Sequence, residues 1–172
     1  MNFYDITGVG FKIPENLHKA LGFARIAIPP TDLSVVNIDT EKSHGARVVY
    51  GSRRERLLEN VRRGAIAVAI TDFYVDKKLL EAMKINDTIL LIPLNSITAV
   101  EGGERSRNAY RAASLIKHAR SLDLRLSFAT MAASADQLLS YPQMVEVARM
   151  AGADRQYARY GISSINKEII GI

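Results

Sequence analysis

Short apolar segments recur along the chain, and most of them are continuous rather than alternating in polarity. A run such as Ala65–Ile70 is typical of a strand that is buried on both faces of a parallel sheet. The pattern predicts strands at Phe3–Thr7, Phe23–Ile28, Ser34–Ile38, Arg47–Tyr50, Ala65–Ile70, Thr88–Pro93 and Arg125–Thr130.

Segments with helical periodicity lie between most of these strands. Helices are predicted at Pro14–Leu21, Arg53–Arg63, Val75–Met83, Arg105–Ser121, Ala135–Ala151 and Ser164–Ile170. Ser52 and Glu55 have the spacing of a capping box, which predicts where the second helix starts. Asp72 is expected to cap the third helix, and Pro142 is expected to break or kink the fifth.

Strands that alternate with helices predict an α/β fold, here as a single domain over residues 1–172. Two architectures fit this alternation: an open doubly wound sheet and a closed (βα)8 barrel. A barrel normally needs ~200 residues or more, so this chain would form a minimal or distorted TIM-like barrel of parallel strands with outer helices. The segment Pro29–Gly45 is too short to hold a full helix between two strands.

The composition restricts the cellular setting and the kinds of chemistry available. The chain has no cysteine, which excludes disulfides and thiolate metal sites and favours an intracellular protein. The N-terminal residues lack the pattern of a secretory signal, and the longest apolar run is too short to span a bilayer. A cytoplasmic protein without a membrane partner is therefore expected.

No familiar catalytic motif occurs in the chain. His18, His44 and His118 fall in separate predicted elements, without the spacing of metal ligands. Gly8 and Gly10 follow the first predicted strand, but the third glycine of a dinucleotide-binding turn is missing. Neither a P-loop nor a nucleophile elbow is present. We therefore predict no cofactor, no metal site and no catalytic residue of this chain's own.

Basic residues are concentrated on the predicted helix Arg105–Ser121, in a chain whose formal net charge is +5. That helix carries six basic side chains and no acidic one before Asp123. At 100° per residue, one face is apolar and the opposite face carries Arg107, Arg111, Ser114 and His118. A stripe of this kind can follow a phosphate backbone, and the alternative is a solvated face without a partner.

Two further basic groups complete the candidate binding residues. Arg53 and Arg54 begin a predicted helix, where positive charge opposes the helix dipole unless an anion binds nearby. Near the C-terminus, arginines alternate with Tyr157 and Tyr160, a combination that suits either RNA stacking or a protein interface.

The same regions carry a family resemblance. It rests on Asn108-x-Tyr110-Arg111 and the following AASLIKHAR, on the strand LRLSFAT, and on the tail QYARYGIS. The small-residue turn that contains Ser134 and the helix that ends before Gly152 add to it. Over about Arg47–Ile172 the chain resembles archaeal ribonuclease P protein component 3, the family of the thirty-kilodalton subunit of eukaryotic ribonuclease P. It departs from that family in its shorter N-terminal half and in the absence of a histidine from DFYVDKKLLEAM.

The resemblance implies a (βα)8-like barrel that is a non-catalytic subunit of ribonuclease P. This endonuclease, a hydrolase with a catalytic RNA, removes the 5′ leader of precursor tRNA. The implied partners are the ribonuclease P RNA and a small α/β protein subunit of the same complex. By position, the residues implied for RNA contact are Arg53, Arg54, Arg111 and Ser134, which join the stripe Arg107, Ser114 and His118. Those implied for partner contact lie within Gln156–Ser163 and are Gln156, Tyr157, Arg159 and Tyr160.

Two other functions fit the residues. A small TIM-barrel enzyme acting on an anionic substrate would place Asp39, Asp72, Asn95 and Thr130 at the C-terminal ends of strands, where barrel active sites lie. A protein-interaction module would use the tyrosine- and arginine-rich tail.

Overall fold

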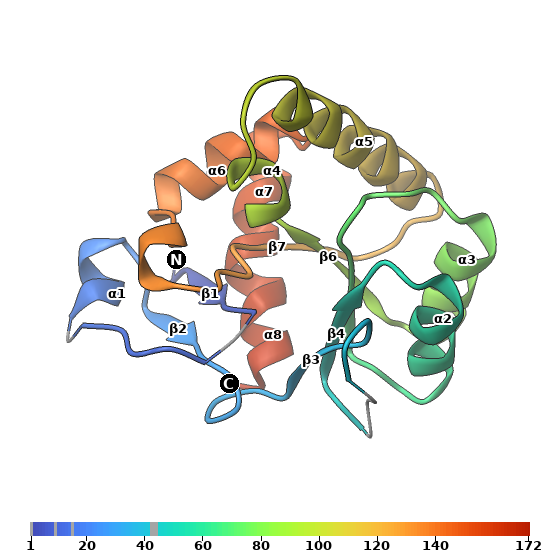
Figure 1. The fold of residues 1–172 in the computed structure, drawn as a ribbon, viewed down its shortest axis with the longest axis horizontal. Coiled ribbons are helices and arrows are strands. Elements are labelled where there is room, and N and C mark those ends of the chain that lie inside the picture. Colours follow the sequence, from blue (N-terminus) through green and yellow to red (C-terminus); the bar gives the residue numbers. More distant parts are fainter. Residues whose placement is uncertain (1, 9, 15, 42–44) are drawn as a thin grey trace.

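The computed structural model describes residues 2–8, 10–14, 16–41 and 45–172, and all strands within these ranges are parallel. Two of them, β1 (Tyr4–Ile6) and β2 (Arg25–Ala27), form a small sheet. The larger sheet contains β3 to β7 in the order of the chain (Figure 1). Its strands are β3 (Val35–Asn37), β4 (Val48–Gly51), β5 (Ala67–Ile70), β6 (Ile89–Pro93) and β7 (Leu126–Ala129). All seven predicted strands are confirmed, with ends that differ by at most two residues.

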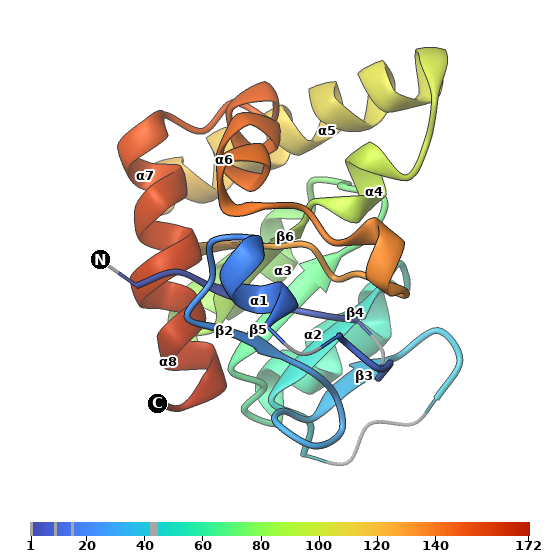
Figure 2. The ribbon, with the colours of Figure 1, turned by 90° about the vertical axis from the view of Figure 1, so that its left-hand side faces the viewer.

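Helices connect β1 to β2 and each successive pair of strands from β4 to β7, and further helices follow β7. They are α1 (Leu17–Ala20), α2 (Arg54–Arg62), α3 (Lys77–Ile85), α4 (Asn95–Thr98), α5 (Gly102–Ser121), α6 (Tyr141–Met150), α7 (Arg155–Tyr160) and α8 (Asn166–Ile170). A 3-10 turn, η1 (Ala135–Gln137), precedes α6, and a π-helical turn, η2 (Gly161–Ile165), joins α7 to α8. The chain from α7 to α8 therefore forms one continuous helical column (Figure 2).

Two of the predicted helix caps, Ser52 and Asp72, are wrong. The Ser52 hydroxyl donates to Asp39, so it does not cap α2, whose N-cap is Arg53. The third helix begins at Lys77 rather than Val75, and its cap is Asp76 rather than Asp72: the Asp76 side chain accepts a hydrogen bond from the backbone of Leu79.

The C-terminal helices also differ from the prediction. The segment predicted as one helix over Ala135–Ala151 contains a 3-10 turn and then α6, which starts at Tyr141. Pro142 lies in the first turn of α6, where proline is tolerated, and does not kink it. The helix predicted at Ser164–Ile170 is the end of the longer column that begins at Arg155.

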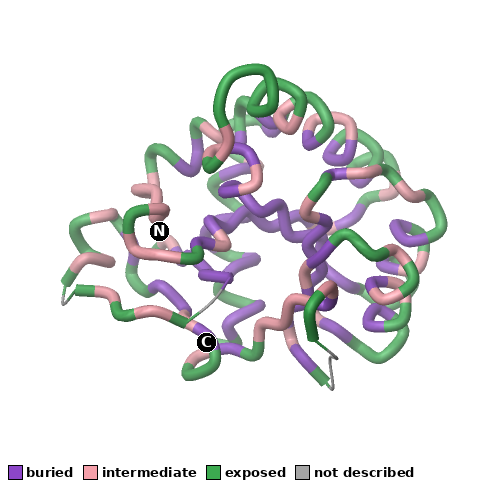
Figure 3. The backbone as a smooth tube through the Cα atoms, in the orientation of Figure 1, coloured by how far each residue is buried: buried purple, intermediate pink, exposed green. Residues whose placement is uncertain are grey.

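Alternate residues of the larger sheet pack on opposite sides. On β6, Leu90 and Ile92 belong to the core beneath α2, α3, α5 and α6. Ile89 and Leu91 belong to the core shared with β1 and the η2–α8 segment. Burial on both faces explains why these strands are continuously apolar. Figure 3 shows the buried positions concentrated in the strands and on the inward sides of the helices.

The two sheets meet where β7 lies beside β1. The Met131 N–H donates to the carbonyl of Ile6 at 2.9 Å, and the Gly8 N–H donates to the carbonyl of Ala132 at 3.0 Å. Further back along both strands, Asn166 of α8 bonds to both backbones. The order has no reversal, unlike a doubly wound sheet. Within the described residues, β2 and β3 belong to separate sheets, so the structure establishes an α/β fold with parallel strands.

The helical column approaches β7 closely at Gly161. A Cβ atom at this position would lie 2.7 Å from the ring of Phe128 and 3.1 Å from the carbonyl oxygen of Leu126. We expect Gly161→Ala to lower the free energy of unfolding by about 1–3 kcal/mol, measured by urea denaturation.

The matched control is Gly103→Ala on the exposed first turn of α5, where a Cβ would meet nothing within 4 Å. This change should be neutral or slightly stabilising, because alanine has the higher helix propensity. Equal effects of the two substitutions would contradict the close packing inferred at Gly161.

Candidate nucleic-acid interface

Helix α5 presents the predicted stripe on its outer face. Its buried face consists of Ala112, Leu115, Ile116 and Ala119. Arg107, Arg111 and His118 are exposed and Ser114 is half-buried, so the helical projection is confirmed. The packing of this helix on the sheet therefore directs several cations towards solvent along one line.

The cations of α5 fall into two groups. Those at the ends bind the protein itself: Arg105 donates to the carbonyls of Val100 and Thr98, and Arg120 pairs with Asp154 at 3.6 Å. In the middle of the helix, Arg107, Arg111 and Lys117 form no ion pair with any residue that the structure describes. Positive charge without an ion-pair partner among the described residues is thus concentrated at the centre of α5.

The C-terminal end of the stripe is linked to the helix backbone. Nδ1 of His118 lies 2.8 Å from the carbonyl oxygen of Ser114 and must donate, because a carbonyl oxygen only accepts. Nε2 of the ring is then the nitrogen available to a partner.

Arg53 and Arg54 have counter-charges within the protein, which the sequence did not reveal. Nε of Arg53 lies 3.9 Å from Oδ1 of Asp39, and Arg54 forms an ion pair with Asp76. Burial raises the pKa of Asp39, but hydrogen bonds from Ser52 and from the backbone of Arg53 outweigh it and hold that pKa below its usual value. The anion expected near these arginines is therefore at least partly supplied by the chain itself.

A pocket of about 420 Å³ lies where α5 meets the loop after β5. Tyr110, Arg111 and Ser114 of α5 line it, together with Asp72 and Tyr74 of the loop. Burial raises the pKa of the Asp72 carboxyl, and the nearby Arg111 opposes that rise. Burial likewise raises the pKa of Tyr74 to about 12. Two of the predicted RNA-contact residues, Arg111 and Ser114, therefore border a recess with aromatic and acidic walls.

Ser134 belongs to a different part of the surface. It lies in the loop after β7, where it caps η1, and its hydroxyl bonds to Asp136, whose pKa it lowers. Gln137 holds this loop by accepting hydrogen bonds from Ala133 and Asn95. No hydrogen bond or ion pair among the described residues joins Ser134 to the stripe on α5.

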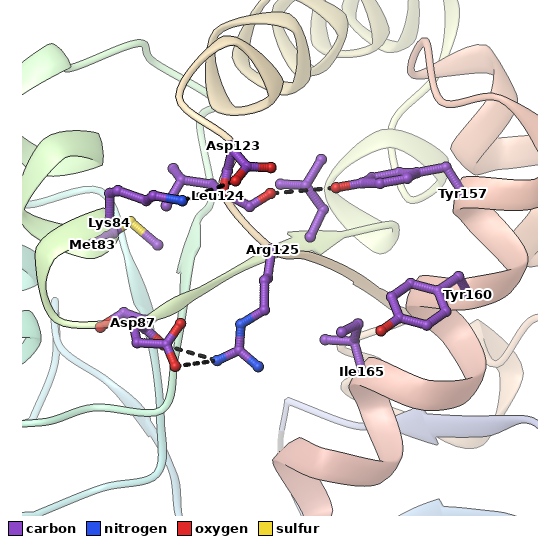
Figure 4. A pocket seen from close by; sticks show the side chains of 11 residues that line it. Met83, Lys84, Asp87, Asp123, Leu124, Arg125, Tyr157, Tyr160 and Ile165 are labelled. Carbon is purple, nitrogen blue, oxygen red and sulfur yellow. Dashed lines mark hydrogen bonds and ion pairs between the residues drawn. The ribbon is translucent and has the colours of Figure 1, made fainter.

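The residues implied for partner contact lie on α7. Gln156 and Arg159 are exposed, and the Tyr157 hydroxyl donates to the carbonyl of Leu124 at 3.3 Å. Tyr160 is 50% exposed and lines a second pocket of about 490 Å³ at the starts of β6 and β7. Figure 4 shows Arg125 in this pocket between Asp87 and Tyr160. Since it lies at strand starts, this pocket is at the opposite edge of the parallel sheet from the one after β5.

The polar residues expected at strand ends are found there, but most bond to other parts of the protein. Asp39 bonds to Ser52 and Arg53, Asn95 bonds to Gln137, and Thr130 donates to Asp5 at 2.6 Å. No group of three or more histidine and acidic residues within the described chain is able to hold a metal ion, and His44 lies outside the described residues.

The sequence-based reasoning missed the contribution of Tyr74 and Tyr110 to the site. The position of Tyr110 beside Arg111 could have indicated that Tyr110 belongs to the site. Nothing in the local sequence indicates that the loop after β5, with Tyr74, packs beside α5.

Comparison with models of protein families and with curated protein sequences finds no match for this chain. None of the helices that the structure describes is both long and apolar enough to cross a membrane.

Proposed function

We propose that this protein is an RNA-binding, non-catalytic subunit of ribonuclease P. The observation that carries the proposal is the centre of α5, where Arg107, Arg111 and Lys117 are exposed without an ion-pair partner among the described residues. The resemblance to the ribonuclease P component supports it, because Arg111 is part of the motif on which that resemblance rests.

A distorted TIM-like barrel is part of this proposal. Its support is the sequential order of parallel strands and the hydrogen bonds by which β7 meets β1, so that the order returns to its beginning. In this interpretation the described residues supply seven strands, and the η2–α8 segment packs where β7 and β1 diverge.

The proposed mechanism is electrostatic. Each arginine that neutralises an RNA phosphate releases a condensed counter-ion, which adds affinity and salt dependence without base specificity. Helix α7, where Gln156, Arg159 and Tyr160 are exposed and Tyr157 is half-buried, is proposed to bind the small α/β protein subunit. It is rich in tyrosine and arginine, residues that are enriched in protein interfaces.

An enzyme acting on a small anionic substrate has less support. Of its four expected strand-end groups, Asp39, Asn95 and Thr130 bond to other residues of the chain. Turnover of a small phosphorylated compound by the isolated chain would favour this alternative over the RNA-binding scaffold.

The double variant Arg107→Ala/Arg111→Ala tests the proposed function. We expect weaker binding to ribonuclease P RNA, and a log–log salt dependence that is flatter by roughly one unit for each lost phosphate contact. The measurement is RNA binding at several salt concentrations.

The charge-matched control is Arg62→Ala/Arg63→Ala, which removes two exposed arginines at the C-terminal end of α2, of which Arg63 is already paired with Glu59. This control should keep the salt dependence of the unmodified protein. An unchanged slope in the α5 variant, or an equal loss in both variants, would contradict the assignment of RNA binding to α5.

A further inference from the structure

The pocket between α5 and the loop after β5 combines three kinds of group. Tyr110 is 78% exposed, although a large aromatic side chain on a monomeric surface is usually better covered. Arg111 and Ser114 lie beside it on α5, and Asp72 and Tyr74 form the opposite wall. The pocket therefore offers a flat ring, a cation and a carboxylate to the same occupant.

The carboxylate of Asp72 determines which part of an RNA fits. A phosphate would be repelled by it, so the pocket is unsuited to the RNA backbone that the centre of α5 would bind. Among the described residues, only the backbone N–H of Asp72 itself bonds to this carboxylate, which leaves acceptor capacity for a ligand. The Tyr74 hydroxyl, a second polar group, is buried and has no hydrogen-bond partner in the described chain.

We propose that this pocket binds one unpaired guanine base of RNA, stacked on Tyr110 and hydrogen-bonded to Asp72. The inference rests on the proposed RNA-binding function and adds a base-specific contact to its electrostatic one. Single-stranded bases are recognised by stacking on aromatic rings and by bonds to their Watson–Crick edges.

Guanine is favoured by the arrangement of its donors. Its ring N1–H and its 2-amino group point in the same direction, so both can donate to the two oxygens of one carboxylate. Adenine presents one amino donor beside a ring acceptor, which would face a carboxylate oxygen unfavourably. Inosine keeps the N1–H but lacks the 2-amino group. Its binding therefore measures the contribution of the N1–H hydrogen bond without that of the 2-amino group.

The test measures binding of the full chain to short single-stranded oligouridine with one central guanosine, inosine or adenosine. We expect the guanosine oligonucleotide to bind about tenfold more tightly than the adenosine one, the range of a bidentate base contact, with inosine between them. If all three bind equally, the inference is overturned while the proposed function stands. If none of them binds and ribonuclease P RNA does not bind either, both fail.

Two pairs of variants assign the preference to the pocket. Asp72→Asn should make the guanosine and adenosine oligonucleotides bind with equal affinity. Glu104→Gln makes the same charge change on an exposed side chain outside the pocket and should preserve the tighter binding of guanosine. Tyr110→Ala should weaken binding of all three by about tenfold through loss of stacking, and Tyr110→Phe should restore it. A base preference that survives Asp72→Asn would overturn the proposed role of that carboxylate.

Discussion

Replacement of Asn166 by leucine is expected to lower the free energy of unfolding by about 3–5 kcal/mol, enough to unfold a marginally stable domain. The Asn166 amide is fully buried on α8 and donates to the carbonyls of Tyr4 at 2.8 Å and Phe128 at 2.9 Å. Its own oxygen accepts a hydrogen bond from the hydroxyl of Ser127. Leucine has a similar size but leaves two strand carbonyls and a hydroxyl buried without partners.

Urea denaturation followed by circular dichroism measures this effect. The control Asn86→Leu removes an exposed amide that bonds only within its own helix end, and it should change stability far less. The double variant Asn166→Leu/Ser127→Ala should recover about 1 kcal/mol, because it removes one of the orphaned groups. If the free energy of unfolding of the Asn166→Leu protein stayed within about 1 kcal/mol of that of the unmodified protein, water would have to replace the amide between β1 and β7.

The strands were predictable because their signal is local and strong. Ala65–Ile70 and Thr88–Pro93 are apolar at almost every position, and burial on both faces of the sheet accounts for this directly. Asn166 gave no such signal. An asparagine within a helical segment usually lies on the surface, and its partner Tyr4 is 162 residues away in the chain.

The predicted cap of α2 was wrong because a distant side chain competed with the local capping signal. Ser52 and Glu55 have the spacing of a capping box, but the Ser52 hydroxyl donates its hydrogen bond to the carboxylate of Asp39 instead of forming that box. For α6 the correct signal was present in the sequence: Ser140 and Gln143 have the same spacing, and both the backbone and the hydroxyl of Ser140 bond to Gln143.

The candidate site shows the same division between local and distant information. The face shared by Arg107 and Arg111 follows from helical periodicity alone, so the sequence predicted it. The ion pair between Arg54 and Asp76 and the placement of Asp72 beside Arg111 depend on tertiary packing. The sequence therefore predicted which cations share one face of α5, but it did not reveal which arginines are paired within the protein.

Replacement of Asp5 by asparagine is expected to remove a pH dependence from folding. Asp5 is fully buried, and burial raises the pKa of its carboxyl from 3.8 to about 6, against the opposing effect of hydrogen bonds from Thr130 and Ile6. A pKa that is raised in the folded state stabilises the protein below the unfolded pKa, and this contribution is lost as the pH rises through the folded pKa. Since each pH unit between the two values corresponds to about 1.4 kcal/mol, and the unfolded group is already partly ionised at pH 4, the loss from pH 4 to pH 7 amounts to about 2 kcal/mol.

Asparagine keeps the shape and can keep the bonds. Its oxygen can accept from the N–H groups of Ile6 and Thr130, which lie 2.8 Å from Oδ1 of Asp5, and its amide can donate to the Thr130 hydroxyl. The Asp5→Asn protein should therefore gain about 2 kcal/mol relative to the unmodified one between pH 4 and pH 7. Because the lowered pKa of Asp39 acts in the opposite direction, the measured quantity is the difference between the two proteins at each pH. A difference that stays constant over this range would mean that Asp5 is ionised in the folded state throughout, and that the hydrogen bonds to its carboxylate outweigh the cost of burying the charge.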